Sequence, residues 1–333
     1  MNYRYAFNEI KQNKLPNISY MIKRIWQFAS EHTKEYKASR IRIFADFILC
    51  TLMYGCDSYE YENYGFFFLR RKEKKKIATE IYEEQFEKAH TDEKQKAIVD
   101  NKEESLVQFS DYVKRDWCGI KYHNEKELYD AFFNAHEVAI FKPVNGQMGK
   151  GIHVEKLSGF LRDGTELRDY CIHNNVIVEE LIVQHDKLNT LYPNAVNTVR
   201  IVTMQGKCIA AALRMGVGDA CVDNAHAGGV FAEINIDKGV IDGSALRCGH
   251  ERYECHPTTG TGIPGFEIPY WEECRQLCEN ASKLVPDIYL LGWDIAVTPD
   301  GPTVVEVNTT PGLMIIQAPN CHGIKHEFEK IKD

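Results

Sequence analysis

The first hundred residues carry apolar side chains at the spacing of amphipathic helices. Apolar residues recur three and four positions apart from Ile22 to Ala29, and similar patterns cover Ala38–Met53 and Glu73–Ala89. This periodicity predicts three helices. The aromatic, turn-like stretch at 54–68 separates the second helix from the third. We expect it to pack as core or as a contact between lobes.

The pattern changes after a polar stretch at His90–Lys102, where we place a boundary. Short runs rich in β-branched residues then predict strands. These runs are Val138–Phe141, Val176–Val178, Thr198–Met204, Ile209–Leu213 and Val230–Ile234. Helical spacing recurs at Glu125–Ala135 and Trp271–Leu284. The expected fold class is α+β, a catalytic body behind a helical cap.

Two predicted strands near the C-terminus carry the most informative polar pattern. They cover Gly292–Ala296 and Thr303–Asn308, with a Pro-Asp-Gly-Pro turn between them. Side chains alternate between the faces of a strand, so Glu306 and Asn308 share one face, and hairpin pairing brings Asp294 to the same patch. Two carboxylates and an amide oxygen suit Mg²⁺, and such a site usually handles a nucleoside triphosphate.

A glycine-rich loop follows the predicted strand that ends in Lys142. It contains Gly146, Gly149, Lys150 and Gly151. Glycine lets backbone N–H groups approach phosphate oxygens, and lysine adds positive charge. The loop is not a Walker A motif, because no Lys-Ser/Thr pair leads into a helix. We interpret it as a hairpin lid. A plain glycine hairpin is the alternative, and the carboxylate hairpin downstream favours the lid.

Further polar residues interrupt or end apolar strands. The run at 176–178 leads directly into Glu179 and Glu180. An interlobe strand of this kind can offer backbone groups to adenine, although a strand end with solvated acids is the simpler reading of the motif alone. Arg200 and Arg214 lie in otherwise apolar strands. A half-buried arginine needs an anionic partner, which is either a ligand or a core acid.

Composition and charge narrow the function classes. The chain has 333 residues, 44% of them hydrophobic, and a net charge of −8, which argues against general nucleic-acid binding. A basic cluster at Arg70–Lys76 reads as a solvated helix face, with anionic lipid or glycan contact as the alternative. His226 reads as a loop histidine or, less simply, as a base.

The cysteine and hydropathy patterns bear on the cellular compartment in which we expect the protein. The eleven cysteines lack CxxC spacing, so we expect reduced, mostly buried thiols in a cytoplasmic protein. The apolar run Ile43–Tyr54 is interrupted by Asp46 and is too short to span a bilayer. A buried helix is the expected structure, and a helix lying on a membrane surface is the alternative.

Taken in order, these motifs resemble the ATP-grasp superfamily, in the branch of ribosomal-protein glutamate ligases and glutathione synthetases. The sugar-transfer-associated ATP-grasp family, found with polysaccharide biosynthesis genes, is closer still. The resemblance extends from residue 45 to residue 322. Its motifs are Glu179-Glu180 with Gln184-His185, Asn197-Thr198-x-Arg200, Asp223-Asn224 with Gly228-Gly229, Gly265-x-x-Ile268-Pro269, Gly292-Trp293-Asp294 and Glu306-x-Asn308-x-x-Pro311-Gly312.

The resemblance implies two α+β lobes that grip ATP. Residues 1–98 would form the helical N-terminal region, 99–180 the first lobe with the lid, and 181–333 the second lobe with the metal site. It implies ATP and two Mg²⁺ ions as cofactors, with Mn²⁺ as an alternative ion.

The resemblance also implies roles for matched residues. Phosphates would be held by Lys102 and Lys142 and covered by Gly146, Gly149, Lys150 and Gly151. Adenine and ribose would be held by Glu179, Glu180, Leu181, Ile182 and Asp186. The metal ligands would be Asp294, Glu306 and Asn308, with Glu306 bridging. The catalytic residues would be Arg200, Arg214 and Asn224.

The activity that this resemblance implies is an ATP-dependent carboxylate–amine ligase that forms an amide through an acyl phosphate. It would join an amino acid or amine to a sugar acid, a glycan or a glycan precursor. A kinase for a hydroxyl group and a non-catalytic nucleotide-binding scaffold are the alternatives. Two features depart from the pattern: the lid carries Gln147-Met148, and the first hundred residues do not read as the α/β domain that precedes the lobes in glutathione synthetase-like ligases. Substrate recognition is therefore expected to differ.

Overall fold

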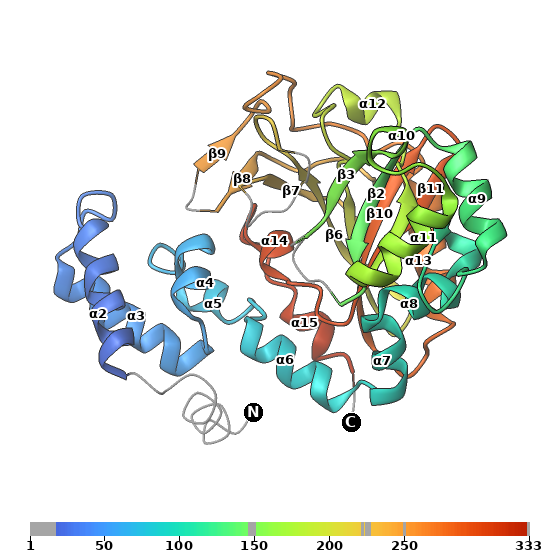
Figure 1. The fold of residues 1–333 in the computed structure, drawn as a ribbon. Coiled ribbons are helices and arrows are strands. Elements are labelled where there is room, and N and C mark those ends of the chain that lie inside the picture. Colours follow the sequence, from blue (N-terminus) through green and yellow to red (C-terminus); the bar gives the residue numbers. More distant parts are fainter. Residues whose placement is uncertain (1–17, 146–150, 221–222, 224–227, 249–250, 332–333) are drawn as a thin grey trace.

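Two antiparallel sheets form the body of the protein (Figure 1). The computed structural model describes residues 18–145, 151–220, 223, 228–248 and 251–331. The small sheet has the strand order β1-β4-β2-β3 and the large sheet the order β11-β10-β5-β6-β7-β8-β9. All the strand pairs within both sheets are antiparallel.

The small sheet is covered on one face by helices. Its strands are β1 (Trp117–Cys118), β2 (Val138–Pro143), β3 (His153–Lys156) and β4 (Val176–Glu180). Phe141 and Val178 pack in one hydrophobic cluster with residues of α9, α10 and α11. These helices cover Lys126–Ala135, Leu157–Phe160 and Gly164–Asn174.

The large sheet is longer and more deeply buried. Its strands are β5 (Val199–Met204), β6 (Lys207–Met215), β7 (Val230–Ile234), β8 (Ala245–Arg247), β9 (Glu251–Tyr253), β10 (Leu290–Thr298) and β11 (Gly301–Asn308). β10 is buried along nearly its whole length, as expected for a central strand covered on both faces.

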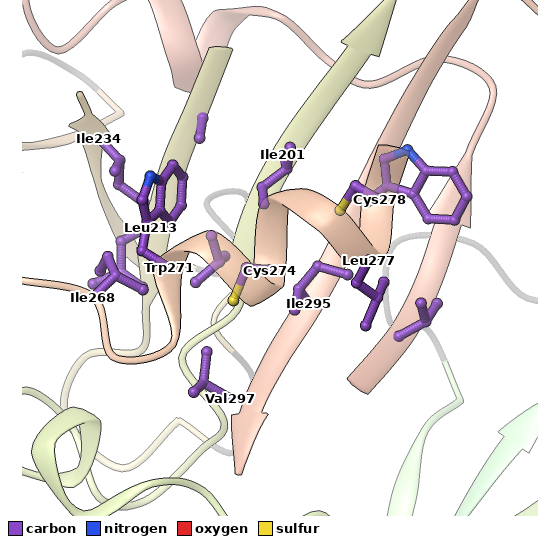
Figure 2. Packing of buried hydrophobic residues seen from close by; sticks show 14 of the residues in the cluster. Ile201, Leu213, Ile234, Ile268, Trp271, Cys274, Leu277, Cys278, Ile295 and Val297 are labelled. Atoms are coloured by element: carbon purple, nitrogen blue, oxygen red, sulfur yellow. The ribbon is translucent and has the colours of Figure 1, made fainter. Parts of the chain in front are cut away.

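One face of the large sheet packs against α13 (Trp271–Ser282), as Figure 2 shows. The helix buries Trp271, Cys274, Leu277, Cys278 and Ala281, which recur three and four positions apart. This spacing places them on one side of a helix. They contact alternate strand residues, including Ile201, Leu213 and Ile295. Side chains one position away, such as Arg200 and Asp294, therefore point to the other face.

The N-terminal helices cover part of the opposite face of the large sheet and leave the rest of that face uncovered. Val202, Met204 and Phe231 belong to one hydrophobic cluster with residues of the N-terminal helices and of α14. These helices are α2 (Ile18–Glu31), α3 (Arg40–Tyr54), α4 (Ser58–Asn63), α6 (Glu80–Ala89) and α14 (Met314–Gln317), whereas the short α5 (Arg71–Lys74) adds no residue to the cluster. The remaining helical elements are α7 (Glu93–Asp100), α8 (Lys102–Gln108), η1 (Ser110–Tyr112), α12 (Asp186–Asn189) and α15 (Lys325–Phe328).

The structure confirms most of the predicted elements. It has the expected α+β composition, with a strand at each of the five predicted runs and a helix at Ala38–Met53. None of the helices in the described part of the chain is long and apolar enough to cross a membrane.

One prediction from the N-terminal region is wrong. The helix expected over Glu73–Ala89 is broken between α5 and α6, with Ile77, Ala78 and Thr79 buried in the gap. The polar stretch at His90–Lys102, where we place a boundary, is helical: it forms α7 and leads directly into α8. The carboxylate of Asp92 caps the α7 N-terminus by accepting from the N–H groups of Lys94 and Gln95.

A buried glutamine explains the break between α5 and α6. Gln317 is fully buried, and its amide oxygen accepts from the N–H groups of Ala78 and Ile324 at 3.0 and 3.1 Å. Its amide nitrogen donates to the Ala78 carbonyl and to the Tyr64 hydroxyl at 2.8 and 3.0 Å. These bonds satisfy a non-helical backbone inside the core, which local periodicity cannot reveal.

We expect the substitution Gln317→Leu to lower the free energy of unfolding by about 2–4 kcal/mol, because it leaves several buried polar groups without partners. Urea unfolding followed by circular dichroism measures the change. The exposed Gln276, which bonds only to Glu272 among the residues described, is the matched control. Gln276→Leu should stay within about 0.5 kcal/mol of wild type. Equal losses in both variants would contradict this role for Gln317.

Candidate functional site

The hairpin of β10 and β11 brings the three predicted metal ligands to one patch. Asp294 lies directly opposite Glu306, and Gly292 lies opposite Asn308. Directly opposed residues of an antiparallel pair point to the same side of a sheet. Asp294, Glu306 and Asn308 therefore share the face that α13 does not cover. The predicted hairpin and the shared face of the three side chains are confirmed.

The Asp294 carboxylate is held by both predicted arginines. Arg200 lies opposite Asp294 in the β5–β10 ladder and donates to it from Nε at 2.6 Å and from Nη2 at 2.9 Å. Arg214 on β6 donates from Nη1 to Asp294 Oδ2 at 3.0 Å. Burial alone would raise the pKa of Asp294, but Arg200 and then Arg214 hold it below its usual range. The group is therefore a buried carboxylate anion.

Arg214 is also paired with Asp223. Its Nη2 lies 3.1 Å from Asp223 Oδ1. The other oxygen of Asp223 accepts from the backbone N–H of Thr198 at 2.8 Å and from the Thr198 hydroxyl. Burial acts to lower the pKa of Arg214, but Asp223 and Asp294 together raise it above its usual value. Arg214 therefore stays charged, and its position is fixed from two sides.

Gly292 allows a close approach beside this network. A Cβ atom at this position would lie 2.7 Å from Pro311 Cβ and 3.5 Å from Arg200 Cδ. The Pro311 carbonyl accepts from Arg200 Nη1. The absence of a side chain at Gly292 thus lets the segment after β11 lie against Arg200.

Lys142 faces this region from the small sheet. Its Nζ donates to Glu179 Oε2 at 2.8 Å, and Arg115 Nε donates to the same oxygen at 2.5 Å. Burial acts to raise the pKa of Glu179, but Arg115 and then Lys142 lower it to about 2. Burial lowers the pKa of Lys142, with Glu179 acting in the opposite direction. Glu179 is thus a structural anion that orients Lys142.

Arg115 also joins the two sheets. Its Nη1 and Nη2 donate to the carbonyls of Val304 and Val305 on β11 at 2.5 and 3.2 Å. The guanidinium therefore connects β4 of the small sheet with the strand that carries Glu306. Lys102, at the start of α8, completes the group with Nζ 3.4 Å from Glu306 Oε1.

A cavity of about 1160 Å³ lies between the sheets and contains these groups. The predicted residues on its lining are Lys102, Lys142, Glu179, Glu180, Leu181, Ile182, Arg200, Arg214, Asp294, Glu306 and Asn308. The N–H of Glu180 already donates to the Asp116 carbonyl at 2.9 Å, which leaves only its carbonyl for a ligand. The adenine contact expected from the Glu180 backbone is therefore limited to its carbonyl.

Some predicted residues do not lie on this lining. Asp186 is exposed in the first turn of α12 and is not among the cavity residues, whereas Gln184 and Asn189 are. Gly151 lies beside Pro143, with φ +77°. Gly146, Gly149, Lys150, Asn224 and His226 lie outside the described residues.

The N-terminal helices supply one wall of the same cavity. Tyr59, Glu60, Glu80, Glu83 and Glu84 line it. Both oxygens of Glu83 accept backbone N–H groups from the segment after β11, at 2.9 and 3.2 Å. Burial raises the pKa of Glu83 to about 7 and that of Glu60 to about 8, despite the backbone N–H groups that act to lower them.

The donor set on the hairpin fits a hard divalent cation. Asp294 Oδ1 accepts one hydrogen bond, from Arg200, and keeps a lone pair for a further partner. The Glu306 side chain is 46% exposed, so its carboxylate is accessible. Asn308 Nδ2 is buried and has no hydrogen-bond partner among the described residues, so turning this amide costs no hydrogen bond. Carboxylate and amide oxygens are the ligands that Mg²⁺ prefers.

Sequence reasoning missed Arg115, Glu60 and Glu83. The partners of Arg115 lie 64 to 190 positions away, and those of Glu83 lie 229 and 230 positions away. No local motif marks such residues.

A family model for sugar-transfer associated ATP-grasp proteins matches residues 82–333. The chain belongs to the sugar-transfer associated ATP-grasp family. Its two lobes are those of the ATP-grasp fold, as the motifs predicted. No curated protein matches the sequence.

Several solved structures are similar to the chain at low identity. The ATP-grasp ligase PsnB, complexed with a phosphomimetic variant of its minimal precursor, Mg and ADP, shares 16% identity over 75% of this chain and 66% of its own, with a TM-score of 0.43. D-cycloserine synthetase DcsG shares 10% identity over 71% of each chain, with a TM-score of 0.42. D-alanine–D-alanine ligase from Bacillus anthracis, complexed with ATP, shares 14% identity over 72% of this chain and 64% of its own, with a TM-score of 0.40. The chain thus spans about two thirds of the length of the PsnB chain it matches.

The raised pKa values predict a pH dependence of stability. Glu60, with a folded pKa of about 8, favours folding in its protonated form. That contribution is full below the ordinary carboxyl pKa and is lost as pH rises through the folded value. We therefore expect the free energy of unfolding to fall between pH 5 and pH 8, by at most about 1.4 kcal/mol per pH unit for each such group.

Glu60→Gln should flatten this fall, measured by urea unfolding at several pH values. Glu273→Gln, at an exposed position on α13, should keep the wild-type slope. A Glu60→Gln profile parallel to that of wild type would rule out the effect.

Proposed function

We propose that the protein is an ATP-dependent carboxylate–amine ligase that uses Mg²⁺ and forms an amide through an acyl phosphate. One observation carries this proposal. The oxygen-rich hairpin, both lysines and both arginines that ATP-grasp chemistry uses line the same cavity.

The charge balance of the cavity supports a metal–nucleotide complex. The four cationic side chains on its lining, and Arg115 behind them, are each paired with a carboxylate. The cations are Lys102, Lys142, Arg115, Arg200 and Arg214, and the carboxylates are Glu179, Asp223, Asp294 and Glu306. A triphosphate added here needs further positive charge, and a divalent cation is the usual source. Asp294, Glu306 and Asn308 would hold Mg²⁺, or Mn²⁺, which neutralises phosphate charge and polarises the γ-phosphoryl group.

The lysines and arginines would bind the phosphates. Lys142 is oriented by Glu179, and Lys102 lies beside Glu306, so both ammonium groups border the hairpin. Arg200 and Arg214 each keep N–H groups beyond those given to acids and carbonyls. These donors would stabilise the charge that develops as the substrate carboxylate attacks the γ-phosphorus. Asn224 would assist them.

The lid and the hinge would complete nucleotide binding. Gly146, Gly149, Lys150 and Gly151 would close over the triphosphate and exclude water, since acyl phosphates hydrolyse readily. The Glu180 carbonyl and the backbone of Leu181 and Ile182 would contact adenine. Asp186 would need to move inward to reach the ribose, and Gln184 and Asn189 are better placed in this structure.

The wall from α4 and α6 supports an amine as the second substrate. Four glutamates line it, and among the described cavity residues these two helices contribute no lysine or arginine. The pKa values of Glu60 and Glu83 are raised toward neutrality, so the wall can exchange protons with a bound amine, and its lack of basic residues disfavours the phosphorylated product of a kinase. A buried carboxylate with a pKa near neutrality, as at Glu83, is also suited to accept a proton from the incoming amine.

The family description suggests where the substrates come from. A sugar-transfer association fits a sugar acid, glycan or glycan precursor as the carboxylate and an amino acid or amine as the nucleophile. We also propose a cytoplasmic location and the division into residues 1–98, 99–180 and 181–333.

The substitution Glu306→Ala should reduce Mg²⁺-dependent turnover by about a hundredfold or more, because it removes the most exposed metal ligand. It should change the free energy of unfolding by less than about 0.5 kcal/mol, since the side chain packs little. Isothermal titration of ATP with and without Mg²⁺ gives a second readout. Asp300→Ala, in the turn of the same hairpin, is the control. Wild-type Mg²⁺ dependence in Glu306→Ala would refute the metal assignment.

The decisive experiment is phosphate release with ATP and Mg²⁺ across amino acids and amines crossed with uronic acids and nucleotide sugars, followed by mass spectrometry. A product lighter by one water than the two summed substrates establishes ligation and names both. ADP with a phosphorylated product that resists hydroxylamine establishes a kinase instead. ATP binding that does not depend on Mg²⁺, with no turnover, favours a scaffold.

A further inference from the structure

Helix α3 is apolar on both of its faces. Ile43, Phe47 and Cys50 face the core. On the opposite side, the exposed fractions of Ile41, Leu49 and Leu52 are 70%, 55% and 54%. A helix on the surface of a globular protein normally presents polar residues to water. We therefore expect the outer side of α3 to contact another apolar surface.

Exposed aromatic and aliphatic residues extend this surface on both sides. Trp26 on α2 packs edge-on against Phe44 of α3, with ring centroids 5.5 Å apart. On the other side, the Arg42 guanidinium lies 5.6 Å from the Phe67 ring, next to the exposed Phe68. We call the set of exposed apolar residues the α3 face. It comprises Ile22, Trp26, Ile41, Leu49, Leu52, Met53 and Phe68.

Cations border the α3 face, although the whole chain carries a net charge of −8. The exposed cations on and beside it are Arg40, Arg42, Arg70, Arg71, Lys72, Lys75 and Lys76. The single acid of α3, Asp46, accepts from Lys74 Nζ at 3.2 Å and from the Tyr61 hydroxyl at 2.8 Å. The Glu73 carboxylate accepts from the Arg70 N–H. Asp46 is therefore paired within the protein. The exposed Glu73 is outnumbered by the cations around it, so the border along α3 and α5 has an excess of positive charge.

We propose that the α3 face docks on a membrane surface that contains anionic lipid, with α3 lying in the plane of the interface. Exposed Trp, Phe, Leu and Ile between arginines and lysines are the residues that enter the boundary of headgroups and acyl chains. The basic border complements the negative potential of anionic lipids. The excess of cations along α3 and α5 favours anionic lipid over a purely apolar protein partner.

The position of the α3 face suits a docked enzyme. Helices α2 and α3 lie at one end of the molecule, and α9 and α11 lie at the other (Figure 1). None of the α3 face residues lines the cavity. Docking therefore leaves the cavity open, and the proposal does not depend on the proposed reaction.

Vesicle co-sedimentation of the full chain tests the proposal. We expect at least about tenfold stronger partition into phosphatidylcholine vesicles with about 30% phosphatidylglycerol than into pure phosphatidylcholine, weakened by salt. Leu49→Glu combined with Leu52→Glu should reduce this partition at least about tenfold. The matched control is Leu128→Glu, an exposed leucine on α9 at the far end, which should partition as wild type does.

Circular dichroism and ATP binding should be the same in all three proteins, so that a loss of partition is not a loss of fold. Equal partition of wild type and the double variant into anionic vesicles would overturn the proposal. A full chain that does not partition into anionic vesicles would also overturn it. Two further measurements would then identify what covers the α3 face. A dimer by light scattering that the double variant abolishes would assign the face to a second copy. Partition gained only on removal of residues 1–17 would assign it to that segment.

Discussion

An unpaired buried charge is among the costliest features that a folded protein can contain, and the inner face of the large sheet is organised by this constraint. Asp294 is buried on a central strand, so Arg200 from the adjacent strand β5 and Arg214 from β6, one strand further, accompany it. Arg214 in turn requires Asp223, which is tied to the backbone at the start of β5. Each charge fixes the position of the next one. The result is a rigid array whose remaining donors and lone pairs point toward a cavity.

The same reasoning explains how the two sheets are connected. Glu179 is buried at the end of β4 and is neutralised by Lys142 from its own sheet and by Arg115. The other N–H groups of Arg115 donate to carbonyls of β11. A charge pair inside the small sheet therefore also sets the position of the hairpin that carries Glu306. One guanidinium therefore fixes the position of Glu179, which orients Lys142, relative to the hairpin that carries Glu306.

The sequence was sufficient wherever the relevant signal was local. Strand alternation placed Asp294, Glu306 and Asn308 on one face, and the hairpin turn supplied their pairing. It failed at α5 and α6, where helical spacing continued through Ile77 but a distant Gln317 stabilised a non-helical backbone. Local sequence patterns could not identify Arg115 or Glu83, because their hydrogen-bond partners lie far away in the sequence.

The hydrophobic cluster under the N-terminal helices indicates how long a segment of the chain this fold requires. The segment recognised as family begins at residue 82. Yet Phe47, Tyr61 and Phe66, which precede it, share one core with Val202 and Phe231 of the large sheet. A chain begun at residue 82 would expose that core and leave the Gln317 amide without Ala78 and Tyr64. The segment that matches the family model is therefore shorter than the segment that shares the hydrophobic core, and the helices before residue 82 are needed to shield that core from water.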